Sequence, residues 1–181
     1  MTDTSPPRPH RNTYWVIPGR LLAGEYPGAP TEQQAKDKLK QFLDCGIDSF
    51  LDLTGQDELA PYAHLVAELA GEHGIIVRHR RLTIRDMDIP ERPEHMHTIL
   101  TQIDKWLASG RNVYVHCWGG VGRTGMVIGC HLVHRGLEGQ QALERMAELW
   151  QEVSEDKRRR FPGSPHTWQQ LDYVRNWSTR T

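Results

Sequence analysis

The segment from His116 to Thr124 combines residue types that can bind and attack a phosphate group. Its sequence HCWGGVGRT places Cys117 and Arg123 with five residues between them, and three of those five are glycines. A cysteine thiolate is a strong nucleophile, and the planar guanidinium of an arginine can bind two oxygens of one phosphate group. This spacing indicates nucleophilic catalysis by Cys117 on a phosphate that Arg123 binds.

The glycines indicate how the loop itself can bind an anion. A loop between a strand and a helix can curl so that successive backbone N–H groups point inward, and the helix N-terminus adds to the attraction. Glycine permits the curl because it has no Cβ. His116 is predicted to restrain the loop from behind, and Thr124 to donate a hydrogen bond to the sulfur as it leaves. The predicted substrate-binding residues of the loop are Trp118, Gly119, Gly120, Val121 and Gly122.

Three other phosphate or metal motifs do not fit this segment. A nucleotide-binding P-loop would need a lysine, and the loop has none. The glycine register does not match a dinucleotide-binding fingerprint. Cys117 has no second cysteine two residues away, so a zinc site is not indicated. We therefore predict no metal or cofactor; the alternative is a glycine-rich turn that contains Cys and Arg by chance.

Strand and helix patterns alternate around the loop. This alternation predicts one α/β domain with a central, mostly parallel sheet flanked by helices. The segment 157–165 is expected to be a loop, with Ser164 as N-cap and Pro165 as the first residue of the last helix. Predicted strands lie in 13–24, 47–54, 75–84 and 112–117, and predicted helices in 31–46, 65–74, 96–110, 123–134, 137–150 and 165–175.

Composition and charge restrict the class of protein. The 181 residues predict a disordered leader over 1–12 and one catalytic domain over 13–178. A net charge of −1 does not favour a nucleic-acid partner, and no apolar run approaches the roughly 20 residues that span a bilayer. No signal peptide is evident, so we predict a cytoplasmic protein with no membrane partner. The odd number of cysteines does not form a disulfide scaffold, and redox regulation through Cys130 or Cys45 stays open.

The segment HCWGGVGRTG resembles the signature of the cysteine-dependent protein tyrosine phosphatase superfamily, which is His-Cys, five residues, Arg-Ser/Thr. The chain length and the loop resemble the dual-specificity phosphatases. The aromatic residue after the cysteine, followed by Gly-Gly, is similar to the kinase-associated phosphatase type. The resemblance implies a dual-specificity phosphatase fold and hydrolysis of a phosphomonoester through a cysteinyl-phosphate intermediate.

The resemblance also implies a general acid in a loop before the signature. Such loops often contain Asp, three residues and Pro, a spacing that Asp86 and Pro90 match in RDMDIP. Asp88 does not match it and is the second choice. In the C-terminal segment SPHTWQQLDYV, Gln170 matches a glutamine that helps to position the hydrolytic water in some members; an exposed helical glutamine is the alternative.

The substrate stays open between three classes. The first is a phosphorylated protein, with phosphotyrosine and also phosphoserine or phosphothreonine as targets. The second is a small phosphomonoester such as an inositol phosphate, a sugar phosphate or a nucleotide, and the third possibility is an inactive phosphate-binding module. Val121 stands where phosphoinositide phosphatases tend to carry lysine, which argues against highly phosphorylated inositols. The run Arg158–Arg160 is either a solvated face or a contact for an acidic substrate surface.

Overall fold

A computed structural model describes residues 6–178 as one α/β domain around a five-stranded sheet. The strand order is β1-β2-β5-β3-β4, with β1 antiparallel to β2 and all other neighbours parallel. The predicted fold class is confirmed. The strands are β1 (Thr13–Ile17), β2 (Leu21–Gly24), β3 (Ser49–Asp52), β4 (Arg78–Arg81) and β5 (Val113–His116).

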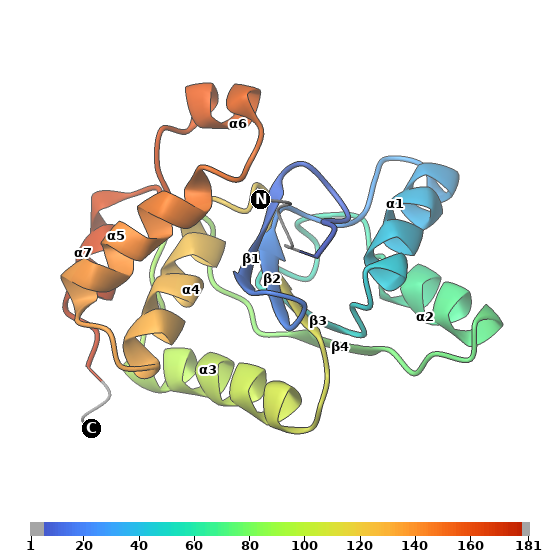
Figure 1. Cartoon of the computed structure of the whole chain (residues 1–181), viewed down its shortest axis with the longest axis horizontal. Helices are drawn as coiled ribbons and strands as arrows, with labels where there is room; N and C mark the ends of the chain where they lie inside the picture. Colours follow the sequence, from blue (N-terminus) through green and yellow to red (C-terminus); the bar gives the residue numbers. More distant parts are fainter. Residues whose placement is uncertain (1–5, 179–181) are drawn as a thin grey trace.

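Helices cover both faces of the sheet (Figure 1). The pair α1 and α2 packs on one face, and α3, α4, α5 and α7 pack on the other. The short α6 projects beyond the end of α5. The helices are α1 (Glu32–Asp44), α2 (Ala63–Glu72), α3 (Pro93–Ala108), α4 (Gly122–His134), α5 (Gly139–Trp150), α6 (Glu155–Arg160) and α7 (Trp168–Arg175).

The central strand β5 explains why the segment that begins at Cys117 is buried and firmly supported. Its four residues are all buried, and their side chains alternate between the two faces. Val113 and Val115 enter the core beneath α3 and α4, whereas Tyr114 enters the core beneath α1 and α2. Hydrogen-bonded neighbours on both sides fix the strand, so the loop that begins at Cys117 starts from a fixed point.

Two predicted boundaries near the C-terminus are wrong. Residues 155–160 form α6 rather than part of a loop, because the Ser154 hydroxyl accepts a hydrogen bond from the backbone N–H of Lys157 and so caps a helix. The last helix begins at Trp168 with Thr167 as its N-cap, not with Ser164. The Ser164 hydroxyl instead donates to the carbonyl of Val121 at 2.7 Å, so it does not serve as a cap.

The predicted strand over 75–84 is shorter than expected and covers only β4. The predicted disordered leader also differs in part, since its described residues contact the domain. Arg8 donates to the carbonyl of Glu152 at 2.6 Å, and the indole of Trp15 donates to the carbonyl of Pro6 at 3.1 Å. Residues 1–5 lie outside the described part of the chain. Within that part, no helix is long and apolar enough to cross a membrane.

Candidate active site

Three carbonyl groups of the loop between β5 and α4 are held by hydrogen bonds. The carbonyl of Cys117 accepts from His116 Nδ1 at 3.0 Å, and that of Trp118 accepts from the backbone N–H of Tyr26 at 2.8 Å. The carbonyl of Val121 accepts from the Ser164 hydroxyl. Because the N–H and C=O of one peptide group point in opposite directions, the N–H groups of Trp118, Gly119 and Gly122 point away from these partners, which is the orientation that an anion-binding loop needs. Cys117 itself is only 3% exposed.

The glycine at position 120 is required by both conformation and space. Gly120 has φ of +68°, which is in the left-handed region that disfavours residues with a Cβ. A Cβ there would also lie 2.3 Å from the backbone carbon of Gly24. The loop therefore packs directly against the end of β2, where the backbones of Gly120 and Gly24 are too close to leave room for a side chain on Gly120.

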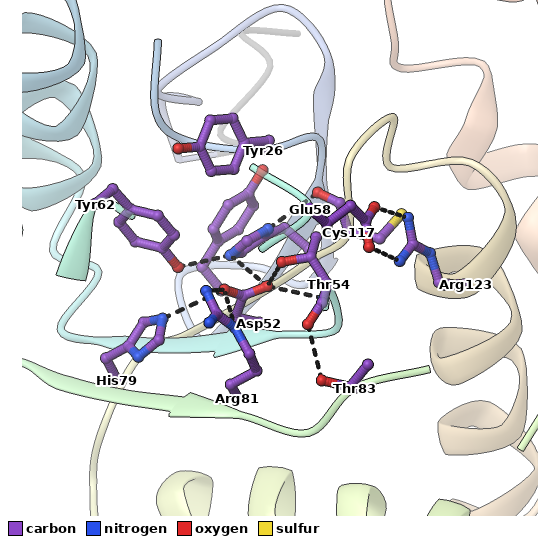
Figure 2. A network of polar contacts seen from close by, with 12 residues as sticks. Tyr26, Asp52, Thr54, Glu58, Tyr62, His79, Arg81, Thr83, Cys117 and Arg123 are labelled. Atoms are coloured by element: carbon purple, nitrogen blue, oxygen red, sulfur yellow. Dashed lines mark hydrogen bonds and ion pairs between the residues drawn. The ribbon is translucent and has the colours of Figure 1, made fainter. Parts of the chain in front are cut away.

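A polar network that includes Asp52, Thr54 and Tyr62 lies next to the loop (Figure 2), and His116 belongs to it. Since Nδ1 of His116 donates to a carbonyl, its Nε2 accepts from the hydroxyl of Tyr62 at 2.6 Å. Burial lowers the pKa of His116 to about 4, although the negative charge of Asp52 acts to raise it. The imidazole is thus neutral at pH 7 and restrains the loop through a hydrogen bond rather than a charge.

Asp52 anchors the same network at the end of β3. Its side chain is 1% exposed and accepts hydrogen bonds from Thr54 N at 2.9 Å and from Arg81 Nη2 at 2.9 Å. Burial raises the pKa of Asp52, but the contacts with His79 and His116 and the hydrogen bonds from Thr54 outweigh burial and lower it well below its ordinary value. The carboxylate stays charged and cross-links β3 to β4 beneath the loop.

We expect the protein to lose stability as the pH falls from about 6.5 to about 4. Burial lowers the pKa of both His116 and His131 to about 4, so in this window the unfolded chain binds protons that the folded chain does not. Each histidine is expected to lower the free energy of unfolding by roughly 2 kcal/mol between pH 7 and pH 5. Urea unfolding at both pH values measures this. A free energy of unfolding that does not change across the window would contradict it.

Arg123 is buried at the start of α4 and is held by a carboxylate that the sequence analysis did not identify. Its two terminal nitrogens donate to Glu58 Oε2 at 2.8 Å and to Oε1 at 2.6 Å, as Figure 2 shows. Nη1 also donates to the carbonyl of Ile84 at 3.2 Å. Burial lowers the pKa of Arg123, but the hydrogen bonds to Glu58 and the charge of Cys117 outweigh burial and raise it. The guanidinium is therefore fixed in position before any substrate arrives.

One donor of Arg123 has no partner among the described residues. Among the described residues, Nε of Arg123 is buried and has no hydrogen-bond partner. Burying an unpaired donor of a charged group is costly, so it indicates a position that a ligand completes. Nη2 also forms an ion pair with Asp86 Oδ1 at 2.9 Å. A bound oxyanion can accept from Nε and take the place of Asp86 at Nη2.

The structure separates the two candidate acids. Asp86 lines the cavity above Cys117 and contacts Arg123, whereas Asp88 does not line it. Asp88 turns its carboxylate to its own loop, where Oδ1 accepts from the backbone N–H of Ile89 at 2.9 Å. Between them, Met87 has φ of +62°, a strained value for a residue with a side chain. The strained turn directs the two aspartates to different sides.

Thr124 and Gln170 are both fully buried. Within the described residues the Thr124 hydroxyl has no hydrogen-bond partner, so its predicted bond to the sulfur is not formed in this state. Gln170 donates to the carbonyl of Asp88 at 3.1 Å and accepts from the backbone N–H of Thr167 at 3.2 Å. A Cβ on Gly122 would lie 2.7 Å from its amide oxygen. Gln170 is thus not an exposed glutamine; it joins the acid loop, the start of α7 and the catalytic loop.

The cavity above Cys117 has a volume of about 610 Å³ and is lined by both apolar and basic side chains. The exposed Trp118 and Met87 contribute to its wall. Basic groups come from outside the loop, from α1 and α6; Lys38 and Lys157 were not predicted to lie there, whereas Arg160 belongs to the run for which a substrate contact was one of two alternatives. The lining side chains considered below are Glu25, Lys38, Asp86, Trp118, Arg123, Lys157, Arg160, Phe161 and His166.

The family model described as the Swiss Army Knife protein, DSP-PTPase phosphatase domain, matches residues 10–174. The chain belongs to this dual-specificity phosphatase family. The predicted resemblance and the cysteine-dependent phosphatase class are therefore confirmed. The family assignment agrees with the geometry, because the buried Cys117, the hydrogen-bonded carbonyls and the fixed Arg123 are what a phosphate-binding DSP-PTPase loop needs.

Individual proteins are similar to this DSP-PTPase domain over most of its length. A protein of Arabidopsis thaliana named phosphatidylinositol 3,4,5-trisphosphate 3-phosphatase and protein-tyrosine-phosphatase PTEN1 is 26% identical over 72% of the chain, which spans 31% of that relative. A crystal structure of a mutant form of Tk-PTP has a TM-score of 0.66 at 25% identity, covering 94% of this chain and 97% of Tk-PTP. A crystal structure of kinase-associated phosphatase has a TM-score of 0.63 at 21% identity, covering 85% of this chain and 83% of that one.

Two residues of the site, Asp52 and Glu58, were not predicted from the sequence, and only the first of them could have been. Asp52 is a charged residue among the apolar residues of the predicted strand 47–54, and a charge buried in such a strand must be paired, so it was a detectable sign of a polar network. Glu58 lies in the irregular segment between β3 and α2, where no periodicity marks it. Its role follows only from the fold, which brings it to Arg123 from 65 positions away in the sequence.

Proposed function

We propose that the protein hydrolyses phosphomonoesters through a cysteinyl-phosphate formed on Cys117. The observation that carries the proposal is the loop itself, in which bonded carbonyls at Cys117, Trp118 and Val121 turn the adjoining N–H groups away from their partners, next to a cavity that the buried cysteine lines. A thiolate and a phosphate dianion are both stabilised by such an array and by the helix N-terminus.

In the first step, the Cys117 sulfur attacks phosphorus in line with the ester bond. The P–O bond to the leaving group breaks as the S–P bond forms, and Asp86 gives its proton to the leaving oxygen. The loop N–H groups and Arg123 stabilise the charge on the three equatorial oxygens. The fixed Arg123–Glu58 pair supports this role, because the guanidinium needs no reorganisation during the reaction.

In the second step, water attacks phosphorus on the face that the alcohol has left. Asp86, now a carboxylate, takes a proton from that water, and the S–P bond breaks to return the Cys117 thiolate and free phosphate. The Thr124 hydroxyl is buried beside the loop without a partner, which suits a donor that stabilises the leaving sulfur. Gln170 acts as a positioning residue, since it ties the carbonyl of Asp88 to the catalytic loop and so fixes the loop that carries Asp86.

The proposed substrates are phosphorylated proteins, with phosphotyrosine first, or small phosphomonoesters. The exposed Trp118 and Met87 at the cavity wall favour an aryl phosphate, because an aromatic ring can stack against them. The Arabidopsis relative is named both as a phosphoinositide phosphatase and as a protein-tyrosine-phosphatase. This name supports a substrate other than a protein as the second class. We further propose that the enzyme acts in the cytoplasm and needs no metal, cofactor, nucleic acid or membrane.

Hydrolysis of a generic aryl phosphate by the purified protein tests the function. Phosphate release is expected in the presence of EDTA, and vanadate, which mimics the five-coordinate phosphorus, is expected to inhibit it. An activity that EDTA removes and a metal ion restores would contradict the mechanism. Binding of phosphate without any turnover would instead favour the inactive phosphate-binding module.

We expect Asp86→Asn to reduce kcat by about 10²-fold and Asp88→Asn to have little effect. Asp86 lines the cavity and contacts Arg123, while the Asp88 carboxylate is used within its own loop. The loss is expected to be largest for substrates with poor leaving groups, since these need the proton most. Comparison of an aryl phosphate with an alkyl phosphate measures this. A large loss in Asp88→Asn alone would reverse the assignment of the acid.

A further inference from the structure

Helix α6 brings positive charge to the edge of the catalytic loop. Lys157 Nζ would lie 3.9 Å from a Cβ on Gly119, so the ammonium group is directly beside the N–H groups proposed to bind the scissile phosphate. Lys157 and Arg160, one helical turn apart, both line the cavity. In Figure 1 α6 projects at the end of the molecule where α4 begins.

Phe161 organises these cations. The Lys157 ammonium lies 5.7 Å from the centre of its ring, and the Arg160 guanidinium lies 5.4 Å from it. The ring of His166 packs edge-on against the same phenyl at 5.3 Å and also lines the cavity. Cation–π contacts of this kind restrict two otherwise flexible side chains. The half-buried Lys157 and the exposed Arg160 are thus both held beside the cavity by the same ring.

The charge of this wall is not balanced by the protein. Glu25 is its one carboxylate apart from Asp86, which contacts Arg123. Glu25 is shared between Lys157 at 3.0 Å and Lys38 at 3.7 Å. Burial raises the pKa of Glu25, but the charges of Lys157 and Lys38 outweigh burial and lower it. Within the described residues, no carboxylate forms an ion pair with Arg160.

We propose that Lys157, Arg160 and Lys38 form a second anion subsite, which binds a second phosphate group on a small substrate molecule. The proposal rests on the proposed function, since the scissile phosphate occupies the loop. An arginine fork beside two ammonium groups matches the several oxygens of a phosphate better than the two of a carboxylate. A volume of about 610 Å³ lies within the range of small-molecule sites, roughly 300–1,000 Å³, and exceeds what one phosphate group fills.

The subsite changes the inference drawn from Val121. The loop has no lysine at that position, which argued against highly phosphorylated substrates. The cationic charge is supplied instead by α1 and α6, from residues far from the signature in sequence. The members of the run Arg158–Arg160 therefore differ in their surroundings. Arg160 lines the cavity, whereas Arg159 forms an ion pair with Glu155 outside it.

Matched substrates test the subsite. We would measure kcat/KM for inositol 1-phosphate, inositol 1,4-bisphosphate and two phosphotyrosine peptides with acidic or neutral neighbours. The wild type is expected to prefer the bisphosphate over the monophosphate by about tenfold or more. Arg160→Ala is expected to lower that ratio by about tenfold, and Arg160→Glu to lower it further. The matched control Arg159→Ala, in the same helix but outside the cavity, is expected to keep the wild-type ratio.

A wild-type ratio near one, or a ratio that Arg160→Ala leaves unchanged, would overturn the subsite. A preference for the acidic peptide without a preference for the bisphosphate would also overturn it, and would assign the cations to protein carboxylates. Failure of the proposed function is distinguishable, because then no substrate would be hydrolysed in a manner that depends on Cys117. In that case calorimetric titration with both inositol phosphates still tests the subsite. The bisphosphate is expected to bind more tightly than the monophosphate, and Arg160→Ala is expected to remove that difference.

Discussion

Cys117→Ser is expected to reduce turnover of an aryl phosphate on the order of 10⁴-fold or more. A serine hydroxyl at this position is a much weaker nucleophile than a thiolate, because the loop N–H groups and the helix N-terminus do not ionise an alcohol at neutral pH. The side chain is 3% exposed, and serine is slightly smaller than cysteine, so the fold is expected to persist. Phosphate release at saturating substrate measures the loss.

The same variant separates catalysis from binding. Since the N–H groups and Arg123 remain, Cys117→Ser is expected to bind vanadate or a phosphorylated ligand with an affinity close to that of the wild type. Cys130→Ser is the matched control, because Cys130 lies on α4 in the core, where burial raises the pKa of its thiol well above the ordinary value. Equal turnover in wild type and Cys117→Ser would remove Cys117 as the nucleophile.

Arg123→Lys is expected to reduce kcat/KM by about 10²- to 10³-fold. Lysine keeps the charge but loses the fork, so it cannot pair with both oxygens of Glu58 and also present a donor to the substrate. The loss is expected mainly in kcat, because the equatorial oxygens carry most charge in the transition state. Steady-state kinetics with an aryl phosphate, together with the inhibition constant of vanadate, measures both effects.

Glu58→Gln is the companion variant for Arg123→Lys. The amide oxygen of glutamine still accepts one hydrogen bond from the guanidinium, so this variant is expected to lose only about tenfold. Circular dichroism confirms that each variant is folded, since Arg123 is 1% exposed and also donates to the carbonyl of Ile84. Full activity in Arg123→Lys would show that the fork is not needed, and would contradict the assigned role.

The predictable part of the site was the part whose chemistry is local in sequence. Cys117, Arg123 and the glycines lie in one loop, and the strand before them alternates between two buried faces, so both the proposed nucleophile and the strand that supports it follow from the sequence pattern. The roles of Glu58, Tyr62 and Lys157 depend on contacts between segments tens of residues apart. Periodicity gives no information on such pairs, because it reports only which face of its own element a residue occupies.

The wrong predictions of helix boundaries also arise from contacts that local sequence patterns do not report. Lys157–Arg160 is basic and has no apolar stripe, so it gave no helical signal; Ser154 and two acidic residues before it start the helix instead. Ser164 has the type and position of an N-cap, but its hydroxyl is engaged by the carbonyl of Val121. Capping preference is a local rule, and here a tertiary hydrogen bond to the catalytic loop determines the outcome.

The catalytic loop is in contact with distant parts of the chain, and this bears on when activity can appear during folding. Gly24 presses on Gly120, the N–H of Tyr26 fixes Trp118, and Ser164 fixes Val121, so the loop needs segments from both ends of the domain. Contacts of such long sequence separation form late, because chain closure must precede them. Recovery of enzymatic turnover after dilution from denaturant should therefore coincide with the final cooperative transition, and partly folded species should be inactive.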